Sequence, residues 1–262
     1  MKYGFIGCGN MGGAIARALS MKTKDILLSD PSAQTPVLAQ ELGCHVGDNQ
    51  TVVQSCDRII LAVKPQMMAK VLAPVAETLA ARKPLIITIA AGIEMQQIEK
   101  WIGTSLPIIR LMPNTPVSVG KGMIVYCCND LVSEADLADF LSDMAFSGTL
   151  DRIDEKLIDA ASALSGSGPA YYYLFLEAMA DGAVACGLPR QKALAYAAAT
   201  MEGAAQMFLQ SGKHPGELKD AVCSPAGSTI VGIQALEQHG FRGAVMDCIT
   251  SAYQRNKELG KS

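Results

Sequence analysis

Charge of either sign is scarce in this sequence. Only 18% of its 262 residues are charged, and 22 Lys and Arg against 25 Asp and Glu leave a net charge of −3. Lys and Arg form no run, so the positive surface on which nucleic-acid and anionic-membrane binders depend is missing. Neither class of partner is expected.

Groupings of metal ligands and paired cysteines are lacking as well. The three histidines, His45, His214 and His239, are far apart along the chain and form no H-x-x-x-H cluster. The eight cysteines include no C-x-x-C pair. We therefore expect no metal site, and buried, reduced thiols in place of disulfides.

Long apolar runs are also missing. The longest uncharged stretch, 160–176, is interrupted by Ser165-Gly166-Ser167-Gly168-Pro169 and cannot form a clean membrane-spanning helix. The sequence enters a predicted strand at once, without a basic segment and apolar core of the secretory type, which favours the cytoplasm. Half of the residues are nevertheless apolar, so we expect a compact globular protein with some apolar surface covered by another subunit.

The pattern of elements predicts an α/β protein with two domains. Residues 1–152 alternate strand and helix signals, which is typical of a wound parallel sheet. Strands are predicted at 2–6, 26–29, 45–46, 58–63, 85–90, 108–111, 123–127 and 149–152, and helices at 11–20, 36–42, 66–80, 95–101 and 133–142. Residues 153–262 lose the strand signals and predict an all-α domain with helices at 155–164, 170–186, 190–210, 215–222, 228–238 and 243–259.

The motif Gly7-Cys8-Gly9-Asn10-Met11-Gly12 carries the first functional prediction. It follows the first strand and opens a helix, which is the setting of a dinucleotide-binding loop. The first glycine permits the tight turn, the second permits close approach of the pyrophosphate, and the third permits close packing of helix on strand. The helix N-terminus then attracts the diphosphate.

The identity of the dinucleotide stays open at this level. Asp30 ends the second predicted strand, where an acid would bind a ribose 2′-hydroxyl and favour NAD. Asp30 also precedes Pro31 and could simply begin a turn, and Ser32 could reach a 2′-phosphate.

Further loops follow other strands at the edge where wound sheets bind ligands. They are Ala62-Val63-Lys64-Pro65, Ala90-Ala91-Gly92 and Met112-Pro113-Asn114-Thr115-Pro116. Asn114 and Thr115 either present polar groups to this edge or form an ordinary rigid turn. In the helical half, Ser224-Pro225-Ala226-Gly227 leads into a helix at Ser228-Thr229, which either offers free N–H groups to an anion or caps the helix with its own hydroxyls.

Taken together, these motifs resemble the pyrroline-5-carboxylate reductase family in order and spacing over essentially the whole chain. The segment around Thr229 resembles the signature of that family, and His214-Pro215-Gly216 and Ser165-Gly166-Ser167-Gly168-Pro169-Ala170 add to the match. The resemblance implies reduction of 1-pyrroline-5-carboxylate to L-proline by NADH or NADPH, the last step of proline biosynthesis. It also implies a Rossmann-type domain and a helical domain that interlocks in a homodimer, which in some members assembles into a decamer.

The resemblance also assigns roles to residues. Ser228 and Thr229 would bind the substrate, with Thr229 catalytic through its hydroxyl. Asp30, the candidate for the ribose, joins the residues that the resemblance places at the NAD or NADP cofactor: Ile6, Gly7, Cys8, Gly9, Asn10, Met11, Asn49, Ala62, Val63, Lys64, Pro65, Ala90, Ala91 and Gly92.

Two departures keep other functions in view. Gly212 and Ala221 stand where some members of the family place a Glu near the substrate and an Asn at the cofactor. The alternatives are another imine or β-hydroxyacid dehydrogenase that depends on NAD(P), and a nucleotide-binding scaffold without activity.

Overall fold

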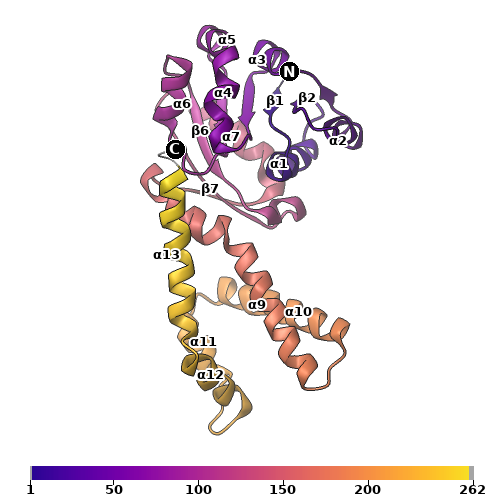
Figure 1. Ribbon diagram of the computed structural model, residues 1–262, viewed down its shortest axis with the longest axis vertical. Coiled ribbons are helices and arrows are strands. Elements are labelled where there is room, and N and C mark those ends of the chain that lie inside the picture. Colours follow the sequence, from indigo (N-terminus) through magenta and orange to yellow (C-terminus); the bar gives the residue numbers. More distant parts are fainter. Residues whose placement is uncertain (1, 260–262) are drawn as a thin grey trace. The chain divides into compact units, whose positions relative to one another are not determined.

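The computed structural model describes residues 2–259 (Figure 1). Contacts divide the chain into two compact units, one formed by Met1–Pro169 with Ser251–Ser262 and the other by Ala170–Thr250. No helix in the described part of the chain is both long and apolar enough to cross a membrane.

The first unit is built on an eight-stranded sheet in the order β3-β2-β1-β4-β5-β6-β7-β8. The strands from β3 to β6 are parallel, β7 runs antiparallel to β6, and β8 runs parallel to β7. The order reverses beside β1, which makes that point the switch where wound sheets bind ligands. The strands are β1 (Tyr3–Ile6), β2 (Ile26–Ser29), β3 (His45–Val46), β4 (Arg58–Leu61), β5 (Leu85–Thr88), β6 (Ile108–Met112), β7 (Gly122–Cys128) and β8 (Gly148–Arg152).

Alternating side chains divide the core between the two faces of the sheet. Ile6 packs with residues of α3, α4, α5 and α6, whereas its neighbour Phe5 packs with residues of α1, α2 and α7. Both faces are therefore covered, as the near-continuous apolar strands require. The helices are α1 (Asn10–Ser20), α2 (Thr35–Leu42), α3 (Asn49–Ser55), α4 (Met68–Leu72), α5 (Ala76–Arg82), α6 (Met95–Ile102) and α7 (Glu134–Asp143).

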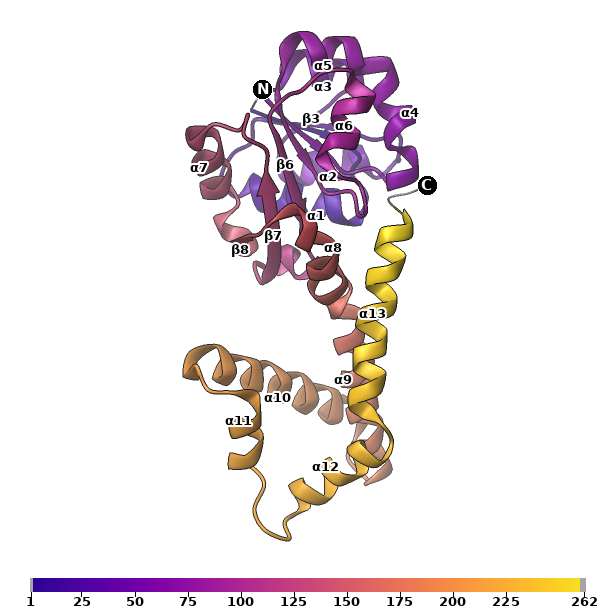
Figure 2. The ribbon, with the colours of Figure 1, turned by 90° about the vertical axis from the view of Figure 1, so that its left-hand side faces the viewer.

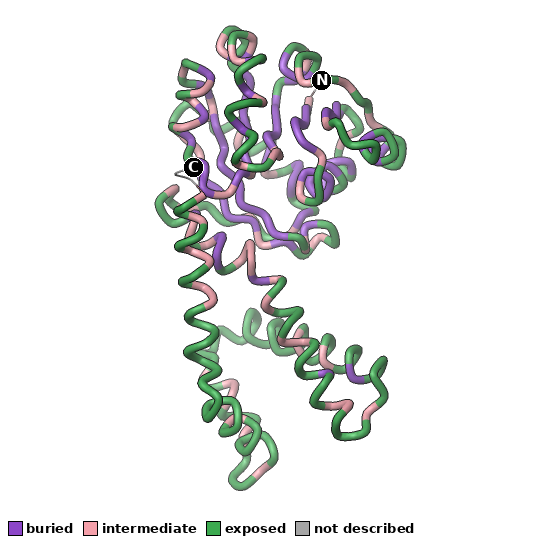
Figure 3. Tube along the Cα trace, viewed as in Figure 1, coloured by how far each residue is buried: buried purple, intermediate pink, exposed green. Residues whose placement is uncertain are grey.

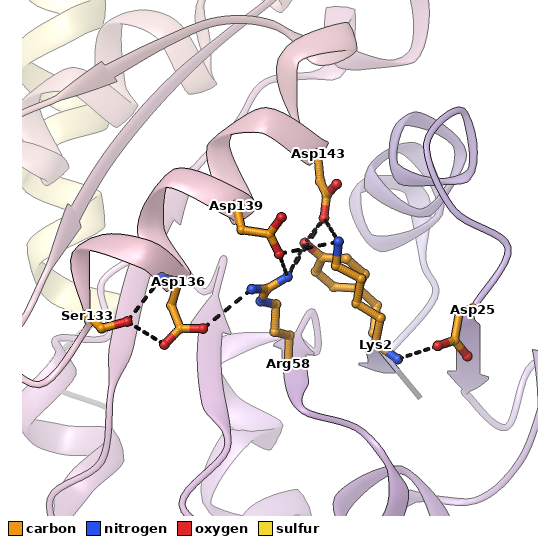
Figure 4. A network of polar contacts seen from close by, with 8 residues as sticks. Lys2, Asp25, Arg58, Ser133, Asp136, Asp139 and Asp143 are labelled. Carbon is orange, nitrogen blue, oxygen red and sulfur yellow. Dashed lines mark hydrogen bonds and ion pairs between the residues drawn. The ribbon is translucent and has the colours of Figure 1, made fainter.

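A charged network fastens α7 to the sheet (Figure 4). Arg58, the first residue of β4, pairs with Asp139 at 2.6 Å, and the hydroxyl of Tyr3 donates to Asp143 at 2.7 Å. Lys2 pairs with the same carboxylate of Asp143, also at 2.7 Å. The network lies where β1 and β4 begin, at the edge of the sheet opposite to the Gly-rich loop.

The helical segments depart from prediction in three places. The helix α3 was not predicted, although Asp48 caps it by accepting a hydrogen bond from the N–H of Thr51. The single helix predicted at 66–80 is divided into α4 and α5 with short 3-10 turns, one of which contains Pro74. The predicted break at Ser165–Pro169 is instead a π-helical turn, Ser162–Gly166, between α8 (Ile158–Ala161) and α9 (Gly168–Ala185).

The second unit contains helices and almost no core. Its helices are most of α9, α10 (Arg190–Ser211), α11 (Pro215–Ala221), α12 (Ser228–Gln238) and the first half of α13 (Phe241–Leu259) (Figure 2). A ring contact between Phe175 and Phe241 joins α9 to α13. Within residues 170–250 the buried apolar residues are Ala180 and Ala193. Most residues of these helices are exposed (Figure 3). The exposed large apolar residues include Tyr172, Tyr173, Leu174, Met207, Leu209, Val231 and Met246.

Candidate active site

The Gly-rich loop joins β1 to α1 in close contact with its neighbours. Gly7 has a φ of +100°, and a Cβ on it would lie 2.7 Å from the backbone carbon and oxygen of Ala62. A Cβ on Gly12 would lie 2.6 Å from the carbonyl oxygen of Gly7. Only glycine fits at these two positions, because both are packed against backbone.

Gly9 is different, because nothing lies within 4 Å of the position of its missing Cβ. It is the N-cap residue of α1, and no side chain of the protein caps that helix. The first N–H groups of α1 are therefore free of side-chain partners and lie beside open space. A pyrophosphate fits this cradle, because the N-terminus of a helix attracts negative charge and a glycine leaves room for it.

Asp30 and Asn49 both line a hollow at the end of β2. The N–H of Cys8 donates to Oδ2 of Asp30 at 2.7 Å, and Ser29 Oγ donates to Oδ1 of Asn49, also at 2.7 Å. These contacts connect the end of β2 to the Gly-rich loop and to the start of α3. Burial, together with the Asp30 charge, raises the pKa of the Cys8 thiol to about 12, so this cysteine stays a neutral lining group.

The other predicted cofactor residues follow strands β4 and β5. Ala62 and Val63 continue from β4 to the exposed Lys64 and to Pro65, which begins a 3-10 turn. The N–H of Ala62 donates to the carbonyl of Ile6, which holds this segment beside β1. Gly92, after β5, has a φ of +74° that turns the chain away from the sheet. The fold thus gathers the predicted cofactor residues at one edge of one sheet.

Asn114 makes hydrogen bonds within the first unit through both of its polar atoms. Its Nδ2 donates to the carbonyl of Ser165 at 3.0 Å, and its Oδ1 accepts from the N–H of Met123 at 3.0 Å. Both polar atoms of this side chain thus already hold the fold, which favours the alternative of a rigid structural turn. Thr115 is exposed.

Ser228 and Thr229 begin α12 in the second unit, and both are exposed. The N-cap residue is Gly227, and no side chain caps this helix. The alternative that a hydroxyl of Ser228 or Thr229 caps the helix is therefore wrong. Ala226 has a φ of +57°, a strained conformation for alanine that often marks functional loops. The helix thus presents free N–H groups beside two hydroxyls, an arrangement that suits a carboxylate.

Within residues 2–259 no group of three or more His, Cys, Asp or Glu side chains is arranged to hold a metal ion. In each unit the candidate residues provide N–H groups at one helix N-terminus together with hydroxyls, and the first unit adds a few charged side chains. Such a set binds and orients anionic groups, and it depends on a bound cofactor for redox chemistry.

Comparison with known proteins agrees with this description. Residues 155–259 match the family described as "pyrroline-5-carboxylate reductase dimerisation". Residues 2–92 match the family described as "NADP oxidoreductase coenzyme F420-dependent". Pyrroline-5-carboxylate reductase from Escherichia coli is 41% identical, with 100% of this chain and 99% of that protein covered, and the enzyme from Pisum sativum is 40% identical over 98% and 95%.

Solved structures give the same result. Pyrroline carboxylate reductase from Plasmodium falciparum, crystallised with NADP bound, is 32% identical with a TM-score of 0.91, covering 99% of this chain and 98% of that one. The enzyme from Streptococcus pyogenes is 33% identical with a TM-score of 0.91, covering 98% of each chain.

A wound sheet with a dinucleotide loop at its switch point, followed by a helical dimerisation domain, defines an oxidoreductase that uses NAD(P). Identity of about 40% over the full length then fixes the family. The chain belongs to the pyrroline-5-carboxylate reductases.

Proposed function

We propose that the protein reduces 1-pyrroline-5-carboxylate to L-proline with NADH or NADPH, as the last step of proline biosynthesis, and that Thr229 is its catalytic residue. The observation that carries the proposal is the identity of about 40% to pyrroline-5-carboxylate reductases over the full length. The N-termini of α1 and α12, which no side chain caps, fit it. One suits a diphosphate and the other a carboxylate, which are the anionic groups of the cofactor and the substrate.

The cofactor binds through the first unit. The N–H groups at the start of α1 hold the pyrophosphate, Asp30 and Asn49 face the adenosine ribose, and the segments 62–65 and 90–92 follow the cofactor toward its nicotinamide end. The nicotinamide, when bound, supplies the hydride. The task of these residues is to hold it in one orientation and to exclude water.

The substrate binds through the second unit. N–H groups of Ser228 and Thr229 hold the carboxylate, and the Thr229 hydroxyl forms a hydrogen bond to the ring nitrogen as the imine becomes an amine. The segment from Ser224 to Thr229 contains no His, Asp or Glu that could act as an acid. A cyclic imine that arrives already protonated needs no such residue, because its reduction then requires only orientation.

A homodimer completes the second unit. Its helices bury two alanines and leave large apolar side chains exposed, so they require a partner surface to form a core. We assign that surface to a second copy of the chain, in agreement with the dimerisation family that matches residues 155–259. We further propose 1–152 and 153–262 as the domain limits, a cytoplasmic location and, for the oligomer, a decamer of such dimers.

The loss of absorbance of reduced nicotinamide tests the proposal directly. Purified protein is mixed with 1-pyrroline-5-carboxylate and either NADH or NADPH, and L-proline is measured as the product. We expect substrate-dependent oxidation with formation of proline. Cofactor binding without turnover would instead favour a scaffold without activity, and turnover of another imine or of a β-hydroxyacid alone would favour a related dehydrogenase.

A further inference from the structure

The carboxylate of Asp30 is fixed in place by the backbone on both sides. Its Oδ2 accepts from the N–H of Cys8 at 2.7 Å, and its Oδ1 accepts from the N–H of Ser32 at 2.8 Å. Rotating this carboxylate away from an incoming group would leave both N–H donors without their acceptor. Asp30 therefore stays at the end of β2, next to the loop that suits the pyrophosphate.

A second carboxylate lies in the same hollow. Asp48 and Asp30 both line it, together with Ser29, Pro31, Gly47, Asn49, Gln50, Val71, Pro74 and Val75. Asp48 accepts from both the N–H and the hydroxyl of Thr51, each at 2.7 Å, and these hydrogen bonds lower its pKa. All ten lining residues belong to the described chain, and none is a Lys or an Arg.

The adjoining hollow offers no free cation either. It is bounded by Cys8, Gly9, Asn10, Gly13, Ala14, Arg17, Ser32, Gln34, Val37, Leu38, Glu41 and Ser118. Arg17 is the one cation in this lining, and its guanidinium is paired with Glu41. A phosphate placed beside Ser32 would therefore face Asp30, and Arg17 could neutralise it only by leaving its pair with Glu41.

We propose that Asp30, assisted by Asp48, makes this chain specific for NADH over NADPH. A ribose 2′-hydroxyl can donate to a fixed carboxylate, whereas a 2′-phosphate at the same place meets like charge. The inference rests on the proposed function, because that function makes the reduced form of the cofactor the relevant one. The preference for one dinucleotide over the other is a property of binding and can be measured without turnover.

The test compares the dissociation constants of NAD⁺ and NADP⁺ by calorimetric titration, without pyrroline substrate. We expect NAD⁺ to bind the unaltered protein at least about tenfold more tightly than NADP⁺. Asp30→Ser should reduce that ratio at least about tenfold, mainly through tighter binding of NADP⁺. Equal or tighter binding of NADP⁺ by the unaltered protein would overturn the proposal, as would an unchanged ratio in a folded Asp30→Ser protein.

Asp30→Asn is a second variant for the case that Asp30→Ser does not fold. Its amide keeps the size of the side chain and one acceptor oxygen for the loop. It should also reduce the ratio, and so should Asp48→Asn by a smaller factor. Asp130→Asn removes an exposed acid from the loop after β7 and should leave the ratio unchanged. A protein with the expected binding ratio but no turnover would contradict the proposed function and leave the specificity assignment standing.

Discussion

Nη2 of Arg110, on β6, lies 2.9 Å from Oδ1 of Asp159, on α8. Only 1% of the Arg110 side chain is exposed, and its Nη1 also lies 3.3 Å from Oε1 of Glu155. The backbone carbonyl of Asp159 in turn accepts from Nδ2 of Asn256, near the end of α13. Within the first unit, one buried cation thus joins the sheet to α8 and, through Asp159, to the end of α13.

Replacing Arg110 by Met should lower the free energy of unfolding by about 3 kcal/mol, because it leaves two partly buried carboxylates without their cation. Urea denaturation at a fixed protein concentration measures the change. Arg255→Met is the matched control. It breaks an exposed pair with Glu258 and should cost less than about 0.5 kcal/mol. A similar small loss for both variants would show that the buried pair does not stabilise the fold.

Gly7→Ala should destabilise the protein much more than Gly9→Ala. Gly7→Ala forces a Cβ against Ala62 at a positive φ and should cost about 2 kcal/mol or more of stability. Gly9→Ala adds a methyl group in open space and should change stability by less than about 1 kcal/mol.

The same Gly9→Ala protein should bind NAD⁺ at least about tenfold more weakly, because its methyl group occupies the space proposed for the pyrophosphate. Thermal unfolding and calorimetric titration measure the two properties separately. Undiminished binding by Gly9→Ala would remove the pyrophosphate from this position.

Thr229→Ala should lower kcat/KM for 1-pyrroline-5-carboxylate by about ten- to a thousandfold, because it removes one hydrogen bond from the transition state. The dissociation constant of the cofactor should stay the same, since Thr229 is not assigned to the cofactor. Thr229→Ser keeps the hydroxyl and should retain most of the activity. Steady-state kinetics measure kcat/KM of the two variants. Full activity of Thr229→Ala would show that Thr229 is not the catalytic residue.

Acid should weaken the attachment of α7 to the sheet. The hydrogen bond from Arg58, with the nearby charge of Lys2, holds the pKa of Asp139 below its ordinary value. Because this pKa is lower in the folded than in the unfolded protein, its stabilisation is present above about pH 4 and is lost as the pH falls further.

The urea midpoint of Asp139→Asn should therefore fall less between pH 7 and pH 3 than that of the unaltered protein. Asp130→Asn, an exposed acid on a loop, should follow the unaltered protein. Equal pH dependence of all three would show that Asp139 contributes nothing to acid sensitivity.

Much of the first unit could be predicted because its signals are local. Apolar strand runs separated by Gly-rich turns gave β2 and β3 with the bounds that the structure has, and the Gly-rich motif gave the turn into α1. The helix α3 was missed because it is short and only two of its residues, Val52 and Val53, are buried. Its one clear signal was Asp48 three residues before Thr51, the spacing of an N-cap.

Side-chain partners far apart in the sequence could not be predicted in this way. Nothing near Asn114 indicates that its amide holds Ser165 and Met123, and nothing near Asp30 indicates that its second oxygen accepts from Cys8. Both contacts depend on strand order, which brings distant loops to one edge of the sheet.

The sequence by itself determined the family, the wound sheet, the helical domain and the identity of the candidate residues, because motifs and periodicity depend only on the order of residues along the chain. Only the tertiary structure decided which polar groups are already occupied and which remain free. It assigned Asn114 to the fold, left the N-termini of α1 and α12 uncapped, and placed two carboxylates in one hollow without a cation. The physical reason is that hydrogen bonds and charge neutralisation depend on distance in space, which separation along the sequence does not specify.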